Sequence, residues 1–288
     1  MTKHFLGVAD EGDDQGWHYL LGILAVLVYW LGFAGLIFLG LEAIFAQIFG
    51  PTEIGNFIAS SATFLPVIVI LFGVVTKLQH RSFQTLINAD AAVNVPRVLL
   101  GFMVWFIQLV IFSGSDIWLN PQNYSFSFNL VHWFLLGPLA VILIPIQTSA
   151  EEFFFRGYLM QGLAMLTKHR LVLTLLTSIA FAVPHFGNPE MQRGVVWGAL
   201  TYFVWGVFFA TITLKDNGLE LALGCHAANN LFATLVVNTP DSVIPTTALW
   251  TYLEAIDSRA GFVGLIIEAT IFYCIFFGGI QRRGNPLE

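Results

Sequence analysis

Charged residues are scarce in this sequence. Asp, Glu, Lys and Arg together make up 10% of its 288 residues, whereas a soluble globular domain carries about 25%. A chain of this length that folded in water would need more charge to cover its outer surface. The deficit excludes an ordinary soluble domain and indicates that lipid is the outer solvent.

Cysteine and clusters of basic residues are also nearly missing. Cys225 and Cys274 are the two cysteines, and both lie in apolar segments. Neither their number nor their spacing fits a disulfide framework or a cysteine-based metal site. No basic patch is suited to nucleic acid. We expect no cleaved leader, because the first apolar run begins only near Tyr19, after an acidic stretch.

Long apolar runs predict an all-α, polytopic membrane helix bundle of about eight transmembrane helices. A bilayer core of about 30 Å needs about 20 apolar residues as a helix. No repeat or linker divides the chain, so we expect one membrane-embedded domain over residues 1–288, with a solvated acidic tail at 1–17. The expected spans are 19–48, 57–75, 98–112, 130 to beyond 149, 171–186, 195–214, 219–237 and 261–280.

The distribution of Lys and Arg predicts that both termini are cytoplasmic. Cytoplasmic loops are enriched in these residues, and the opposite loops contain Arg259 alone, while Arg193 does not fit the pattern. The membrane would be the plasma (inner) membrane in a bacterium and the endoplasmic reticulum in a eukaryote. The basic residues that define the cytoplasmic side are Lys77, Arg81, Arg97, Arg156, Lys168, Arg170, Lys215, Arg282 and Arg283.

Three polar clusters lie inside the apolar segments, where ionisable residues are costly and face a cavity or a partner. In the first, SAEEFFFRGYL, Glu152 and Arg156 are four residues apart and share a helix face. A buried ion pair explains these two residues. Glu151 is turned about 100° away and has no such partner, which makes it a candidate general base. Structural and catalytic interpretations of this cluster both stay open.

The other two clusters each have a structural alternative. His185 follows Pro184 directly, after fourteen residues without charge, and this position also suits a histidine at a membrane interface. His226 and Asn230 are four residues apart on one helix face, next to Asn229. Such a pair can also be an interhelical hydrogen bond.

The three clusters together form the inventory of an active site. Glutamate and histidine can deprotonate a water molecule, and a second histidine and an asparagine can stabilise an oxyanion. The arginine can hold the second carboxylate. Zinc is an alternative, with Glu151, His185 and His226 as ligands, although the spacing is unlike an HExxH helix.

Other polar residues in the apolar segments favour structural roles. Glu42 and Glu268 stand alone in long apolar runs, and we expect them to form hydrogen bonds across the bundle in neutral form. His132 and Trp133 are typical of an interface anchor.

In these residues the chain resembles the CAAX prenyl protease and bacteriocin-processing (CPBP, Abi) family of intramembrane peptidases, in particular the type II CAAX endopeptidases. That family carries EExxxR, FxxxH and HxxxN motifs in this order. The first 140 residues match only as hydrophobic helices. The matching residues are Glu151, Glu152 and Arg156, then Phe181 and His185, then His226 and Asn230.

The resemblance implies an eight-helix peptidase whose catalytic core region here is 140–235. It would cleave a peptide bond near the C-terminus of a membrane-tethered, lipidated or prenylated substrate, in contact with membrane lipid and without nucleic acid. Glu151, assisted by His185, would activate water, and His226 and Asn230 would stabilise the oxyanion. Glu152 and Arg156 would support them. We expect no tightly bound cofactor, with zinc as the alternative; the oligomeric state stays open.

One point of geometry conflicts with this assignment. His185 lies fifteen residues after Arg170, about 22 Å along a helix, whereas Glu151 and His226 are expected near the cytoplasmic side. The segment must be tilted, broken at Pro184 or begin deeper, or the family geometry does not apply.

Two other functions compete with a peptidase. Intramembrane Glu, His and Arg also mark transporters and channels, but no repeat symmetry relates the two halves of this chain. A catalytically idle family member, acting as an immunity or scaffold protein, is the second alternative.

Overall fold

A computed structural model describes residues 4–13, 15–50, 52–244, 246–253 and 257–278. Helices dominate these residues, and three short strands form one small sheet in the order β1-β3-β2. The α-helices are α1 (Gly16–Val28), α2 (Ala34–Phe49), α3 (Glu53–Ala62), α4 (Leu65–Gly73), α5 (Val95–Leu119), α6 (Leu130–Glu152), α7 (Met160–Ala164), α8 (Arg170–Ala182), α9 (Val195–Asp216), α10 (Glu220–Leu235) and α11 (Ser258–Phe277).

Shorter helical turns join or extend these helices. The 3₁₀ turns are η1 (Phe5–Asp10), η4 (Phe83–Leu86), η5 (Pro121–Asn123), η7 (Val183–Gly187) and η8 (Pro189–Arg193), and the π-helical turns are η2 (Tyr29–Phe33), η3 (Val74–Leu78) and η6 (Phe153–Leu159). The strands are β1 (Tyr124–Phe126), β2 (Val237–Asn238) and β3 (Trp250–Tyr252); β3 pairs antiparallel with β1 and parallel with β2.

The prediction of an all-α polytopic membrane bundle is confirmed. Within the described residues, seven helical segments are long and apolar enough to cross a membrane. They are Gly16–Ile48, Glu53–Leu78, Val95–Leu119, Leu130–Ala164, Arg170–Gly187, Val195–Asp216 and Ser258–Phe277. The eighth predicted segment is α10, a shorter helix that is largely buried among the others. The end of the last predicted span and the tail arginines Arg282 and Arg283 lie outside the described residues.

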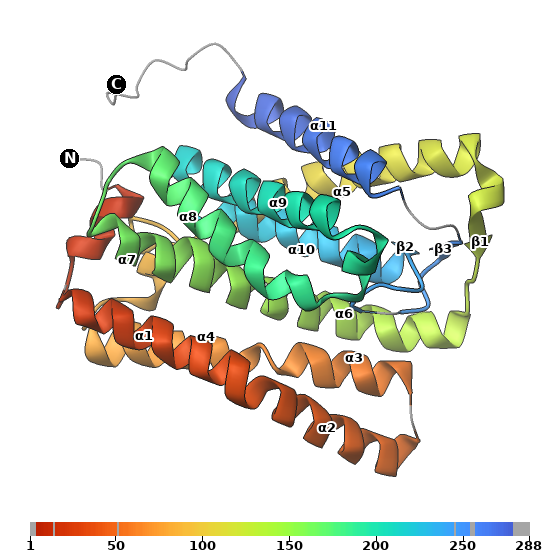
Figure 1. The fold of residues 1–288 in the computed structure, drawn as a ribbon, viewed down its shortest axis with the longest axis horizontal. Coiled ribbons are helices and arrows are strands. Elements are labelled where there is room, and N and C mark those ends of the chain that lie inside the picture. Colours follow the sequence, from red (N-terminus) through yellow and green to blue (C-terminus); the bar gives the residue numbers. More distant parts are fainter. Residues whose placement is uncertain (1–3, 14, 51, 245, 254–256, 279–288) are drawn as a thin grey trace.

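Helix α10 lies in the interior because small residues let it approach its neighbours closely. A Cβ on Gly224 would lie 2.0 Å from the Val98 carbonyl oxygen of α5, and one on Gly101 of α5 would lie 2.8 Å from the Leu221 oxygen. Helices α6 and α9 pack against other faces of α10. Figure 1 shows α1 to α4 along one side of this central group and α11 along the opposite side. Residues on α10 are therefore held by neighbours on several sides.

The prediction of a solvated N-terminal tail is wrong for η1. Phe5, Val8 and Ala9 are each only 1% exposed. The backbone N–H of Phe5 donates to Asn217 Oδ1 at 2.8 Å, and Arg81 Nη1 donates to the Val8 oxygen at 3.0 Å. In the sequence, the acidic residues that follow make this short apolar segment look like part of a solvated tail. In the structure, the segment covers one end of the bundle.

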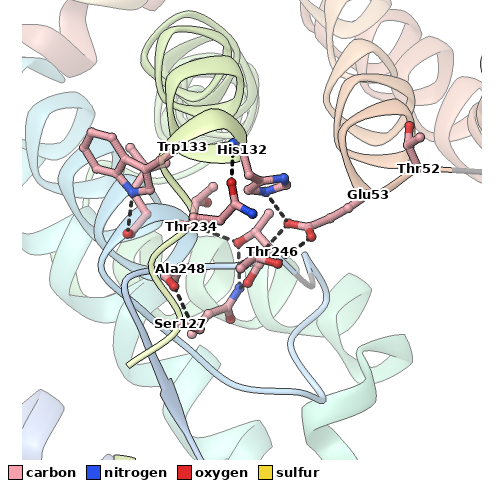
Figure 2. A network of polar contacts seen from close by, with 12 residues as sticks. Thr52, Glu53, Ser127, His132, Trp133, Thr234, Thr246 and Ala248 are labelled. Atoms are coloured by element: carbon pink, nitrogen blue, oxygen red, sulfur yellow. Dashed lines mark hydrogen bonds and ion pairs between the residues drawn. The ribbon is translucent and has the colours of Figure 1, made fainter. Parts of the chain in front are cut away.

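A polar network fixes the β2–β3 connection at the other end (Figure 2). The Glu53 carboxylate of α3 accepts hydrogen bonds from the backbone N–H and hydroxyl of Thr247, and His132 Nε2 of α6 lies 3.2 Å from Glu53 Oε1. Thr246 Oγ1 donates to the Thr234 oxygen of α10 at 2.7 Å. His132 therefore has a partner within the protein, and the network holds a loop that closes one side of the cavity described next.

Candidate active site

The four residues predicted to be catalytic line one cavity of about 590 Å³. Glu151 comes from the last turn of α6, His185 from η7, and His226 and Asn230 from α10. Residues 242–244 of the β2–β3 loop and part of α11 complete the wall. The tertiary structure thus brings together side chains that the sequence spreads over about 80 residues.

The depths of Glu151 and His185 agree, because the helix carrying Glu151 is longer than expected. The segment continues through η6 and α7 to Ala164, so Glu151 lies thirteen residues before its end, about 20 Å at helical rise. His185 is about 22 Å from Arg170 on the same basis. Glu151 therefore does not lie near the end of its helical segment, which corrects the expected placement.

His226 is equally deep for a different reason. The turn before α10 lies inside the bundle: Leu219 is fully buried, its backbone N–H donates to the Ile87 oxygen at 2.7 Å, and Asn88 Nδ2 donates to the Glu220 carboxylate at 2.7 Å. The helix therefore begins well below the end of the bundle. Depths counted along the chain from the preceding polar turn are therefore wrong for the residues of α10.

The helix is broken next to Pro184, which is one of the explanations offered above for the depth of His185. Helix α8 ends at Ala182 and the chain continues as the 3₁₀ turn η7. His185 Nδ1 lies 2.7 Å from the Phe181 oxygen. A carbonyl oxygen can only accept, so Nδ1 carries the proton and the neutral ring presents Nε2 as an acceptor.

Glu152 and Arg156 form the predicted ion pair, and this pair supports His226. Both side chains are fully buried, with Arg156 Nη1 donating to Glu152 Oε1 at 2.8 Å. The same carboxylate oxygen lies 2.8 Å from His226 Nδ1. Because a carboxylate accepts, Nδ1 of His226 carries a proton and its other nitrogen is aimed elsewhere.

The guanidinium of Arg156 also lies against aromatic rings. It is 4.1 Å from the ring centre of Phe181, the aromatic residue of the FxxxH motif, and 5.1 Å from that of Phe209. Cation–π contact compensates part of the lost hydration of a buried cation. Phe209 in turn stacks on His226, with centroids 4.8 Å apart. Sequence reasoning missed Phe209, because phenylalanine is common throughout this chain.

The second nitrogen of His226 faces the other glutamate. His226 Nε2 lies 3.5 Å from Glu151 Oε2. If the ring were neutral and the carboxylate ionised, two acceptors would face each other. A hydrogen bond between the two groups therefore needs a proton, carried either by Nε2 of His226 or by the carboxyl group of Glu151.

Asn230 is oriented by its neighbour. Asn229 Nδ2 donates to Asn230 Oδ1 at 3.2 Å, so the Asn230 amide keeps its N–H₂ group for a ligand in the cavity.

The hydrogen bonds expected for Glu42 and Glu268 need correction, and Arg193 has a partner that the sequence did not indicate. Glu268 was expected to form a hydrogen bond across the bundle, but it lines the cavity. Among the described residues, neither its carboxyl group nor that of Glu42 has a hydrogen-bond partner. Arg193, the charge that did not fit the topology, pairs with Asp241 and donates to Thr239 Oγ1 at 2.8 Å. These hydrogen bonds lower the pKa of Asp241.

The zinc alternative finds no support in the arrangement of the side chains. Within the part of the chain that the structure describes, no group of three or more His, Cys, Asp or Glu residues is placed to hold a metal ion.

Fold and cavity define a polytopic membrane protein with a buried Glu/His site, and the comparisons place it in a family. A sequence model of the "Type II CAAX prenyl endopeptidase Rce1-like" family matches residues 128–232, which contain all three motifs. The uncharacterized protein YyaK of Bacillus subtilis (strain 168) is 34% identical over 247 residues, which cover 81% of this chain and 82% of that protein. No solved structure gives a significant match. The chain belongs to the type II CAAX prenyl endopeptidase Rce1-like family and is an integral membrane protein.

Proposed function

We propose that this protein is an intramembrane endopeptidase that uses an activated water to cleave a peptide bond near the C-terminus of a membrane-tethered or lipidated protein. The observation that carries the proposal is the convergence of Glu151, His185, His226 and Asn230 on one cavity. Membership in a protease family supports the reaction class.

The first step is attack by water on the scissile carbonyl carbon. A water between the Glu151 carboxylate and Nε2 of His185 donates one hydrogen bond to each. Glu151 takes a proton as the water oxygen bonds to the carbon, and negative charge develops on the carbonyl oxygen. His226 Nε2–H and the Asn230 amide donate to that oxygen.

The second step breaks the C–N bond. The oxyanion collapses, the leaving amine takes the proton held by Glu151, and the other product is a carboxylic acid. Glu152 and Arg156 do not touch substrate in this scheme. They hold the His226 ring in place, because Glu152 Oε1 accepts from Nδ1 at 2.8 Å and Arg156 donates to the same carboxylate oxygen. No step passes through a metal.

The proposal includes an orientation with both termini in the cytoplasm. The start of α1 and the end of α11 lie at the same end of the bundle (Figure 1), and the excess of Lys and Arg favours the cytoplasmic side for that end. Reporter fusions at the two termini test this; opposite locations for the two reporters would contradict it.

The decisive experiment measures peptide cleavage by the full chain in nanodiscs. Wild type, Glu151→Gln and His226→Ala are compared on a panel of lipidated and unmodified membrane-tethered peptides. We expect each variant to lose at least about 100-fold in rate, the usual effect of removing a general base or an oxyanion donor. Glu42→Gln is the matched control, because it neutralises a membrane glutamate that does not line the cavity, and it should cleave normally.

Two results would contradict the proposal. Wild type that cleaves no peptide but conducts ions or solutes in vesicles would favour a transporter. Cleavage that a chelator abolishes and zinc restores would contradict the metal-free steps.

A further inference from the structure

The ring of Tyr202 packs on the ring of His185. Tyr202 belongs to α9, and the two ring centres are 4.2 Å apart with an interplanar angle of 28°. Phe181 contacts the same histidine with its centre 4.6 Å away. Tyr202 also lines the cavity, although it is in none of the three motifs. It therefore lies where it can control the orientation of His185.

Two polar residues fix the hydroxyl of Tyr202. Its O–H donates to Glu190 Oε1 at 2.7 Å and accepts from Asn188 Nδ2 at 2.8 Å. Both partners follow His185 closely in the chain, on η8 and at its N-cap. The other carboxylate oxygen of Glu190 is shielded from solvent and has no hydrogen-bond partner among the described residues. Burying a carboxylate oxygen without a partner costs free energy, so the position of Glu190 needs an explanation other than solubility.

His185 needs this support because its own backbone gives little. It sits on a five-residue 3₁₀ turn, and the hydrogen bond from Nδ1 to the Phe181 oxygen is the one that the described residues give its ring. Rotating the ring by half a turn about Cβ–Cγ breaks the hydrogen bond to the Phe181 oxygen and moves Nε2 away from the cavity. A stacked neighbour with an anchored hydroxyl opposes the rotation.

We propose that Tyr202, held by Glu190 and Asn188, is a positioning residue that keeps the His185 ring in the orientation with Nε2 facing the cavity. The proposal deepens the function proposed above and rests on the role given there to His185. Tyr202 acts through His185 and does not itself touch the reacting atoms.

Cleavage kinetics of the full chain in nanodiscs test the proposal. Tyr202→Phe keeps the stacked ring and loses the anchor, so we expect kcat to fall about fivefold with KM unchanged, the effect of one lost hydrogen bond. Glu190→Ala removes the acceptor and should match it. Tyr202→Leu also loses the stacking and should fall about tenfold further. Tyr273→Phe, the same change on α11 away from the cavity lining, is the matched control and should equal wild type.

A double-mutant cycle separates positioning from a general structural effect. In a His185→Ala background, Tyr202→Phe should cause no further loss, because the residue it positions is gone. Equal losses in both backgrounds, or a Tyr202→Leu variant as active as wild type, would overturn the proposal.

Nitrogen-15 NMR of labelled histidine provides a test that does not depend on activity. The signal of His185 should show a single Nδ1–H tautomer in wild type and averaging or a second tautomer in Tyr202→Leu. An unchanged spectrum would overturn the positioning role even if cleavage confirmed the peptidase. Wild type without any cleavage, together with the expected spectral change, would instead overturn only the proposed function.

Discussion

Replacing Arg156 with Met should strongly destabilise the fold, because the change leaves a buried carboxylate without its cation. Arg156 and Glu152 are fully buried and joined at 2.8 Å. Met fills much of the same volume between the rings of Phe181 and Phe209, and its sulfur makes favourable contacts with aromatic groups. The main loss is therefore electrostatic.

The size of this loss follows from the burial of the pair. Removing one partner of a buried ion pair costs about 3–5 kcal/mol, because the remaining charge stays out of water and uncompensated. The double variant Glu152→Gln/Arg156→Met leaves no such charge, and the side-chain carbonyl of the introduced glutamine can still accept from His226. We expect the double variant to recover most of the stability that Arg156→Met loses.

Reversible unfolding in mixed micelles, followed by tryptophan fluorescence, measures the free energy of unfolding. Arg97→Met is the control: its partner is Asp216, and the Arg97 side chain is 30% exposed, so its loss should cost about 1 kcal/mol or less. An Arg156→Met variant within about 1 kcal/mol of wild type would refute the reasoning. So would a double variant less stable than the single one.

Three further predictions concern packing, the oxyanion site and pH. Gly224→Ala should destabilise the protein by about 1–3 kcal/mol in the same unfolding assay, because its Cβ would overlap the backbone of α5. Asn229→Ala should lower kcat several-fold in the cleavage assay while binding is kept, because the Asn230 amide loses the donor that orients it. Because hydrogen bonds from Arg193 lower the pKa of Asp241, the pair contributes stability that is complete above the ordinary Asp pKa of about 3.9 and is lost as pH falls through the lower folded-state pKa. Hydrogen exchange of residues 237–244 should show this acid step in wild type, and Arg193→Gln should lack it.

Local patterns predicted the parts of the site that lie within one helix. A spacing of four residues predicted the Glu152–Arg156 pair, since such residues share a helix face. The contact between Glu152 and His226 spans 74 positions in the chain, and no local pattern contains it. Tyr202 and Phe209 gave no signal either, because aromatic residues fill both the interior and the lipid-facing surface of a membrane protein.

The sequence by itself determined that this protein lies in a membrane, roughly where its helices run, and which polar residues belong to its family motifs. These properties depend on the cost of placing charge in lipid and on short helical periodicity, both of which can be judged segment by segment. Only the tertiary structure decided the depths of Glu151 and His226, the docking of η1, and the aromatic and acidic partners of the two histidines. Those features depend on where helices end and which faces meet, and they are set by packing among residues far apart in the chain.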